Sequence, residues 1–404
     1  MTGLYIDLLW DELNEIIYQA RTALLGAYIS GCNDSLDLQF HGFNDKLPSL
    51  LSKFLTKIKS FLPNHDRFKV IKERKERELK NSNMNPQSHG AYLRLQVLHH
   101  IAYDVDEGLH VLNGLSISDM KSFIPELWSQ VFIEGFCHGN LLEEEAISLS
   151  NILKTKFFVQ PLPIELRHKN HCICLPPSAN LIRDARVKNK SETNSVIELY
   201  FQIEPEVGIE STRLRALIRL FNDIVWEPFS DQLRTKEQLG YSVGCYWVIT
   251  WRVFGFCFNV QSSEYNPIYL QERIDNFING LEEFLKDDDS FESYRGGLME
   301  NLLLKDQSLS EETDRFWHEI TNKYMFDINK KVAEEVKSLE KEDVINFYKT
   351  YMQQSSPKRR RLAIRVWGCN TDFKEAEARR EVEQVIEDLA AFNLSSKYYP
   401  SDCF

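Results

Sequence analysis

The segment Leu233-Arg234-Thr235-Lys236-Glu237-Gln238-Leu239-Gly240-Tyr241 brings an arginine and a tyrosine close to one predicted helix end. Pro228 suits the first position of a short helix and Gly240 the left-handed position that ends it, so Tyr241 opens the next strand. An arginine fork binds carboxylates or carbonyl groups, and a tyrosine hydroxyl can donate to a developing oxyanion. Two interpretations are open here: a helix stop that feeds a strand, or a pair of functional residues.

Metal-binding spacings are the next candidates, since the chain has ten histidines. A zinc peptidase helix needs His-Glu-x-x-His or His-x-x-Glu-His, which place two imidazoles on one helix face. The run His318-Glu319-Ile320-Thr321-Asn322 fails because Asn322 stands where the second ligand should be. The cluster His168-x-x-His171-Cys172-x-Cys174 lacks a second ligand pair, which leaves adventitious binding or a structural site open there. The sequence therefore predicts no catalytic metal site in this chain.

Other catalytic signatures do not occur in the sequence. It has no Gly-x-Ser-x-Gly elbow, no Walker-type loop and no dinucleotide fingerprint after a strand. The stretch Lys72–Lys80 alternates basic residues with glutamate, which is typical of a solvated helix face. The run Lys358-Arg359-Arg360-Arg361 follows Pro357 and predicts a basic loop, either an ordinary loop rim or a phosphate or partner site.

Composition narrows the classes of partner. The formal net charge of −12 argues against nucleic acid, because phosphate binding depends on clustered Lys and Arg. No apolar run reaches the ~18 residues that indicate a membrane span. The N-terminal residues have no basic leader pattern, so we expect a cytoplasmic protein without a membrane partner. The eight cysteines are scattered, which favours reduced thiols.

The elements that position these residues occur twice along the chain. The hydrophobic periodicity predicts a long helix from Leu4 to about Ile29, then an alternating strand, several helices and a strand over Gln130–Phe136. The same series returns about 216 to 230 positions later, with these pairs in order: Trp10 with Trp226, Leu36–Phe40 with Phe256–Val260, Asp66 with Asp289, Asp119 with Asp343, and His138-Gly139-Asn140 with Gly368-Cys369-Asn370. Ordered agreement of this kind indicates two copies of one domain.

The repeat predicts an α+β fold with two similar domains, each a mostly antiparallel sheet flanked by helices. We expect a first domain over residues 1–158, a proline-rich linker over 159–190 and a second domain over 191–404 that carries the RTKEQLGY segment. Copy two begins with a strand, Val196–Glu204, ahead of its long helix, whereas copy one begins with its helix at Leu4. Copy one therefore lacks the equivalent first strand, and an open sheet edge is expected there.

The run LRTKEQLGY resembles the signature of the C-terminal half of the pitrilysin/insulysin family of zinc metallopeptidases, of the insulin-degrading enzyme and nardilysin type. The resemblance extends along essentially the whole chain, through DELNEIIYQA, YLRLQVL, SFIPEL and SVIELYFQIEP. The runs RVFGFCFNVQSSEYNP and RLAIRVWGC look most similar to the plant nardilysin-like branch. The resemblance to this family implies a metalloendopeptidase with two halves, each made of paired α+β domains. The two halves would close like a clamshell around a chamber in which peptides are hydrolysed.

The resemblance also implies roles for residues and partners. Zinc would be the cofactor of the full-length enzyme and would be bound by its N-terminal half, so this chain would hold no metal or cofactor. Arg234 and Tyr241 would assist catalysis from the non-zinc half, Arg234 by holding the substrate backbone and Tyr241 by hydrogen bonding to the tetrahedral intermediate. The implied partners are the zinc-bearing N-terminal half and peptide substrates, with a second copy of the chain as a further candidate.

Three functional interpretations follow for the chain. In the first it is the substrate-binding half of the peptidase and is inactive alone. In the second it is a non-enzymatic interaction module, as core subunits of respiratory complex III are in the wider fold family. In the third it is a truncated gene product without separate activity. The presence of Arg234 and Tyr241 weighs against the second, and the missing first strand of copy one favours the third.

Overall fold

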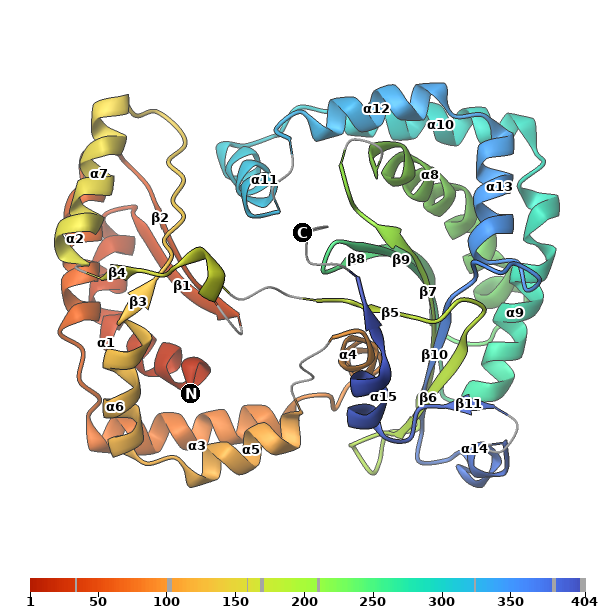
Figure 1. Cartoon of the computed structure of the whole chain (residues 1–404), viewed down its shortest axis with the longest axis horizontal. Coiled ribbons are helices and arrows are strands. Elements are labelled where there is room, and N and C mark those ends of the chain that lie inside the picture. The colour runs from red at the N-terminus through yellow and green to blue at the C-terminus, as the bar shows by residue number, and fades with distance from the viewer. Residues whose placement is uncertain are drawn as a thin grey trace. The chain divides into compact units, whose positions relative to one another are not determined.

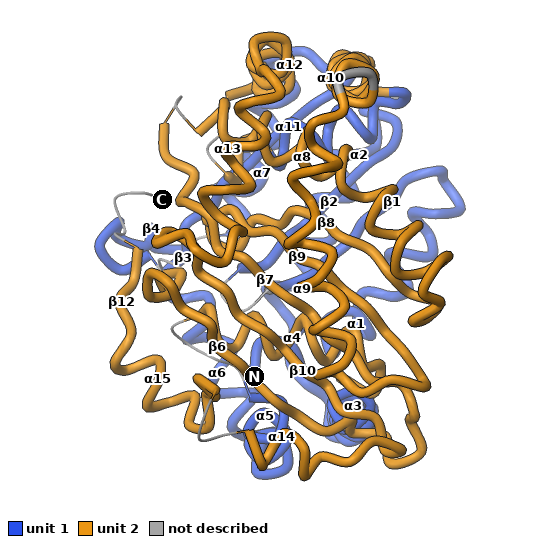
Figure 2. The backbone as a smooth tube through the Cα atoms, turned by 90° about the vertical axis from the view of Figure 1, so that its right-hand side faces the viewer, with its two compact units in different colours: residues 1–82, 104–168, 307–318 blue, residues 83–103, 169–306, 319–404 orange. Residues whose placement is uncertain are grey.

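The computed structural model describes residues 1–32, 35–99, 104–157, 159–167, 171–208, 211–322, 325–379 and 383–399. The chain divides into two units, coloured separately in Figure 2. Unit 1 contains residues 1–82, 104–168 and 307–318, and unit 2 contains residues 83–103, 169–306 and 319–404. Each unit thus takes one segment from the opposite half of the sequence. The predicted boundaries after residue 158 and before residue 191 do not coincide with the ends of these units, since unit 1 continues to residue 168 and unit 2 resumes at residue 169. The division of the sequence into two copies at these boundaries stays a prediction.

Unit 1 is built mainly from helices that surround short strands (Figure 1). Its elements are α1 (Thr2–Thr22), β1 (Gly26–Cys32), β2 (Ser35–His41), α2 (Leu47–Lys59), α3 (His65–Asn81), α5 (Val105–Gly114), α6 (Ile117–Leu127), β3 (Gln130–Val131), α7 (Glu143–Lys156), β4 (Gln160–Pro161), the 3-10 turn η1 (Ile164–Leu166) and most of α11 (Leu309–Thr321). The core joins buried residues of α1, β1 and α2, including Leu9, Ile29 and Phe54. Ser116 and Asp119 form a capping box that starts α6.

The predicted helix from Leu4 to about Ile29 is wrong in its last part. α1 ends at Thr22, and residues 26–32 form the strand β1. Leu24 adopts a left-handed backbone with φ of 57°, which a continuing helix does not allow. Ala27 and Ile29 are buried while Tyr28 between them is exposed, which is the alternation of a strand.

β1 and β2 form a two-stranded antiparallel sheet in which Gly26 pairs with His41 and Cys32 with Ser35. Within the described residues no strand pairs with the other side of β2. The side chains of β2 are accordingly exposed or half-buried. Its repeat equivalent in unit 2, β9 (Val253–Ser262), has partner strands on both sides and is almost wholly buried. This is the open edge that the repeat predicts.

Amide hydrogen exchange should reveal this difference between the two copies. In an antiparallel ladder the amides of one strand alternate between its two sides, so about half of the β2 amides point away from β1. We expect those β2 amides to exchange far faster than their neighbours, while β9 is protected at every position. Mass spectrometry or NMR exchange would measure both strands in one sample. Uniform protection along β2 would show that another segment covers the edge.

Unit 2 holds the larger sheet. Its elements are α4 (Pro86–Leu98), β5 (Ile173–Cys174), β6 (Asn180–Arg186), β7 (Ser195–Pro205), α8 (Ser211–Ser230), the π-helix η2 (Asp231–Lys236), β8 (Ser242–Thr250), β9, α9 (Pro267–Phe284), α10 (Asp288–Leu303), α12 (Ile328–Ser338), α13 (Lys341–Tyr351), β10 (Arg361–Trp367), α14 (Lys374–Arg379), β11 (Gln384–Val385), α15 (Leu389–Ser395) and β12 (Lys397–Tyr398). The sheet order is β11-β6-β10-β7-β9-β8. The ladders from β10 through β7 and β9 to β8 are antiparallel, and those of β6 with β10 and β11 are parallel.

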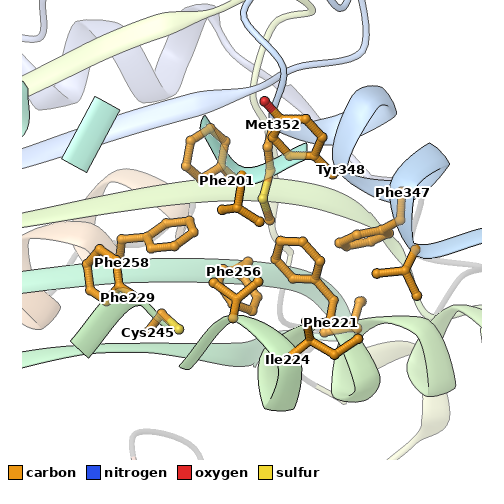
Figure 3. Packing of buried hydrophobic residues seen from close by; sticks show 14 of the residues in the cluster. Phe201, Phe221, Ile224, Phe229, Cys245, Phe256, Phe258, Phe347, Tyr348 and Met352 are labelled. Carbon is orange, nitrogen blue, oxygen red and sulfur yellow. The ribbon is translucent and has the colours of Figure 1, made fainter. Parts of the chain in front are cut away.

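Both faces of this sheet are covered by helices. Figure 1 shows α8, α9 and α13 on one side and α4 and α15 on the other. Alternate residues of β7 divide between the faces, so that Leu199 and Phe201 enter the first core while Val196 and Tyr200 enter the second. Figure 3 shows the aromatic packing of the first core, where the rings of Phe221 and Phe256 lie 5.1 Å apart. The mixed α+β class with a mostly antiparallel sheet is confirmed.

The segment 159–190 is more than the linker that its prolines indicated. β6, near its end, pairs with β10 along seven residues from Asn180 to Arg186 and is an inner strand of the sheet. Sequence reasoning missed it because Leu181 and Ile182 are its only large apolar residues amid polar ones. Among the described residues, no helix has the length and apolarity to cross a membrane.

Candidate functional site

Arg234 lies in the π-helix η2, which continues directly from α8. π-helices are rare, occur mostly as single turns, and are frequent at functional sites. The wide turn closes with a hydrogen bond from the Glu237 amide to the Gln232 carbonyl at 2.9 Å. The Leu239 amide then donates to the Leu233 carbonyl at 3.0 Å, and both leucine side chains are buried. The buried leucines thus anchor the segment, and Arg234 lies on its exposed side.

Tyr241 directly precedes β8 and its side chain is 86 % exposed. The guanidinium carbon of Arg234 lies 4.8 Å from the centroid of the Tyr241 ring. Within the described part of the chain, neither the Tyr241 hydroxyl nor the Arg234 guanidinium has a hydrogen-bond or ion-pair partner. The structure therefore brings the two predicted site residues together with all their polar groups available to a ligand.

Two details of the predicted turn are wrong. Pro228 lies inside α8, three residues before the π-helix, and does not start a helix. The left-handed residue is Gln238, with φ of 54°, and not Gly240. Gly240 is needed for a different reason: a Cβ there would lie 1.9 Å from the carbonyl oxygen of Gln261 on β9. Only glycine permits this close approach of two backbones.

A carboxylate that the sequence analysis did not single out supports the turn. Glu237 accepts hydrogen bonds from Arg273 of α9, with Nε to Oε2 at 2.7 Å and Nη2 to Oε1 at 2.9 Å, and from Gln232 Nε2 at 2.8 Å. The hydrogen bonds from Arg273, and then from Gln232, hold the pKa of Glu237 below its usual value against the effect of burial. A lowered carboxyl pKa means that this stabilisation is present at neutral pH and is lost as pH falls through that pKa. The only sequence signal was a glutamate inside the signature, because Arg273 is 36 residues away.

A small open pocket of about 160 Å³ adjoins Tyr241. It is lined by ten residues from the end of the turn, the end of β9 and the stretch before β7, among them Gln238, Gly240, Ser262 and Glu264. Amides, hydroxyls and backbone groups predominate, so it suits a polar or peptide group.

The predicted metal-binding candidates do not assemble into a site in the described residues, where no group of three or more His, Cys, Asp or Glu is placed to hold a metal ion. His168 lies outside the described residues. Cys172 is buried, and burial raises the pKa of its thiol. On α11, Glu319 is buried and His318 is exposed, so the two side chains differ in environment.

The basic run 358–361 is not a free loop rim. Arg361 begins β10, is 4 % exposed and pairs with Asp275 at 3.0 Å. Arg360 donates to the Ile203 carbonyl at 3.4 Å. Burial, and then the charge of Arg361, lower the pKa of Arg359 to about 10. Arg360 and Arg361 thus bind groups of unit 2, and Lys358 is the exposed member of the run.

Two family profiles match parts of the sequence. Residues 1–111 match the middle or third domain of peptidase M16. Residues 220–317 match domain 4 of the C-terminal lobe of the PqqF-like PQQ synthases. The matches lie in chain order, one in each copy of the repeat.

Curated proteins match over nearly the whole chain. A nardilysin-like protein of Arabidopsis thaliana is 56 % identical over 406 residues, which are 100 % of this chain and 40 % of the relative. Human insulin-degrading enzyme is 32 % identical over 424 residues, which are 99 % of this chain and 41 % of the relative. The chain thus spans about two fifths of the length of these relatives.

Solved structures share the fold. Pitrilysin matches with a TM-score of 0.82 at 20 % identity, over 98 % of this chain and 42 % of pitrilysin. A peptidase M16 inactive domain from Pseudomonas fluorescens matches with a TM-score of 0.64 at 13 % identity, over 90 % of this chain and 87 % of that one.

Proposed function

Because the chain belongs to the pitrilysin/insulysin family and corresponds to the C-terminal half of a full-length member, we propose that it is the substrate-binding half of a peptide hydrolase. In this proposal a separate N-terminal half supplies the zinc site and this chain supplies Arg234 and Tyr241. One observation carries the proposal: an arginine and a tyrosine lie together, exposed, with no competing partner among the described residues.

The chemistry of the pair suits amide hydrolysis. Attack on a peptide carbonyl moves negative charge onto the carbonyl oxygen, and a hydroxyl aimed at that oxygen stabilises the transition state more than the ground state. Tyr241 is the donor in this role. The guanidinium of Arg234 offers a planar set of N–H donors for backbone carbonyls of the bound peptide. Its position against the Tyr241 ring would hold the substrate close to the phenol.

Zinc is not assigned to residues of this chain. The described residues place no suitable ligand set together, so they do not fit a zinc ion. The chain alone is proposed to be inactive. The proposed partners are the N-terminal half and peptide substrates, with a second copy of the chain as a further candidate. The cytoplasm is the proposed compartment.

Combining the chain with a zinc-bearing N-terminal half tests the proposal. We expect the mixture to cleave a quenched fluorogenic peptide and each half alone to be inactive. Arg234→Ala should raise KM and lower kcat, because it removes contacts made to the bound peptide and kept in the transition state. A charge-assisted hydrogen bond from the guanidinium to the peptide contributes about 1.5–3 kcal/mol, so its loss should lower kcat/KM roughly ten- to hundredfold.

The matched control is Arg67→Ala, which removes an exposed arginine of α3 that pairs with Asp11 of α1 in unit 1. It should leave both kinetic constants unchanged. If the halves associate without any cleavage, the chain is better described as an interaction module. If Arg234→Ala cleaves as well as the parent, Arg234 has no role in substrate binding.

A further inference from the structure

The π-helix that carries Arg234 is tied at both ends to one carboxylate. Glu237 follows its last residue, and Gln232, in its first turn, donates to Glu237 Oε1 at 2.8 Å. Arg273 reaches the same carboxylate from α9 with two parallel hydrogen bonds of 2.7 and 2.9 Å. The carboxylate of Glu237 therefore connects three places: the end of the π-helix, its beginning through Gln232, and the neighbouring helix α9 through Arg273. Bidentate arginine–carboxylate pairs add geometric restraint as well as attraction.

The restraint is needed because a π-turn is less favourable than an α-turn. Without it, residues 231–236 are expected to rewind into the i→i−4 pattern of α8. In an α-helix a shift of one residue turns a side chain by roughly 100° about the axis. Such a change would rotate Arg234 away from Tyr241, whose own position is held separately by buried Leu239 and by the contact of Gly240 with Gln261.

We propose that Arg273 is a positioning residue, which acts through Glu237 to keep the π-helix wound so that Arg234 lies against Tyr241. The inference rests on the proposed function of Arg234 and Tyr241 for its catalytic consequence. Arg273 lies on α9, outside the LRTKEQLGY signature, and is not expected to touch the substrate.

NMR of ¹³C-labelled tyrosine rings in the 404-residue chain alone tests whether Arg273 keeps Arg234 against Tyr241. In Arg273→Met the ring signals of Tyr241 should move toward their positions in Arg234→Ala, because both variants remove the guanidinium from the ring. Arg273→Lys should give an intermediate position, since lysine keeps the charge and loses the fork. Denaturant unfolding should change little in either variant, because the pair is partly exposed. Arg67→Met, which breaks an exposed pair between Arg67 of α3 and Asp11 of α1 in unit 1, should leave the Tyr241 signals unchanged.

The catalytic part is tested after the zinc-bearing half is added. Arg273→Met should lower kcat by about ten- to hundredfold, the range for a misplaced group, with partial recovery in Arg273→Lys. Unmoved Tyr241 signals in Arg273→Met would overturn the positioning role whatever the activity. Moved signals with unchanged kcat would support the positioning role and count against the proposed function of Arg234 and Tyr241. Moved signals with a fall in kcat support both.

Discussion

Tyr241→Phe is expected to lower kcat by about 10²–10³ in the enzyme assembled from both halves, roughly 3–4 kcal/mol of transition-state stabilisation. The substitution keeps the ring on which Arg234 stacks and deletes only the hydroxyl. Because the hydroxyl is proposed to donate to charge that develops during the reaction, KM should change little. Steady-state kinetics with a fluorogenic peptide would separate the two constants.

The fold should tolerate this change. The Tyr241 side chain is 86 % exposed and its hydroxyl makes no hydrogen bond within the described residues, so removing it leaves no buried group unpaired. Tyr246→Phe is the matched control, since that residue is also on β8 but its hydroxyl donates to buried Glu198 at 2.7 Å. It should reduce stability and leave kcat of the folded enzyme unchanged. If Tyr241→Phe keeps kcat within about threefold of the parent, the turn is structural and the catalytic role of Tyr241 is withdrawn.

The sequence was a good guide where a signal is local. The alternating strand at 36–40 and the β7 strand were predicted from adjacent residues and are confirmed. Arg234 and Tyr241 were found from a short run, because only seven positions separate them. Their stacking was not predictable, since it depends on a π-turn whose hydrogen-bond pattern has no simple residue signature.

Non-local contacts account for the remaining differences. Arg273 and Glu237 are 36 residues apart, and Gly240 is constrained by Gln261 on another strand. β6 was hidden in a proline-rich stretch because its place is set by pairing with β10, far along the chain. α4 was expected within the first copy, yet its apolar residues Leu93 and Val97 belong to the second core of unit 2. Periodicity shows that a helix has an apolar face and does not show which sheet it covers.

The pair of Arg94 and Glu198 is a buried polar contact that attaches α4 to the sheet. The Arg94 side chain is 6 % exposed and the Glu198 side chain 1 % exposed, with Nε to Oε1 at 2.7 Å. Arg94 also contacts Thr250 Oγ1 at 3.4 Å and lies over the Tyr200 ring at 5.5 Å. Burial raises the pKa of Tyr246, so its hydroxyl stays protonated and donates to the second oxygen of Glu198. All charged groups of this network are satisfied within unit 2.

Arg94→Met should therefore destabilise unit 2 by about 3–5 kcal/mol, the range for removing one partner of a buried ion pair. Methionine fills most of the space of the arginine stem, so the cost arises mainly from a buried carboxylate without its cation. Denaturant unfolding of the chain, followed by far-UV circular dichroism, would measure it. Arg213→Met is the control: Arg213 pairs with Glu335 and Asp343 but is 41 % exposed, so its loss should cost no more than about 1 kcal/mol.

The double variant Arg94→Met with Glu198→Gln separates charge from packing. Glutamine keeps an oxygen that can accept from Tyr246 and removes the unpaired charge, so most of the lost stability should return. Stability in the double variant near that of the parent would mean that the ion pair adds little net free energy and that apolar residues such as Leu93 and Val97 hold α4. If Arg94→Met alone costs no more than the exposed control, water reaches Glu198 and α4 is not closed over the sheet. That result would contradict the burial on which the second core of unit 2 depends.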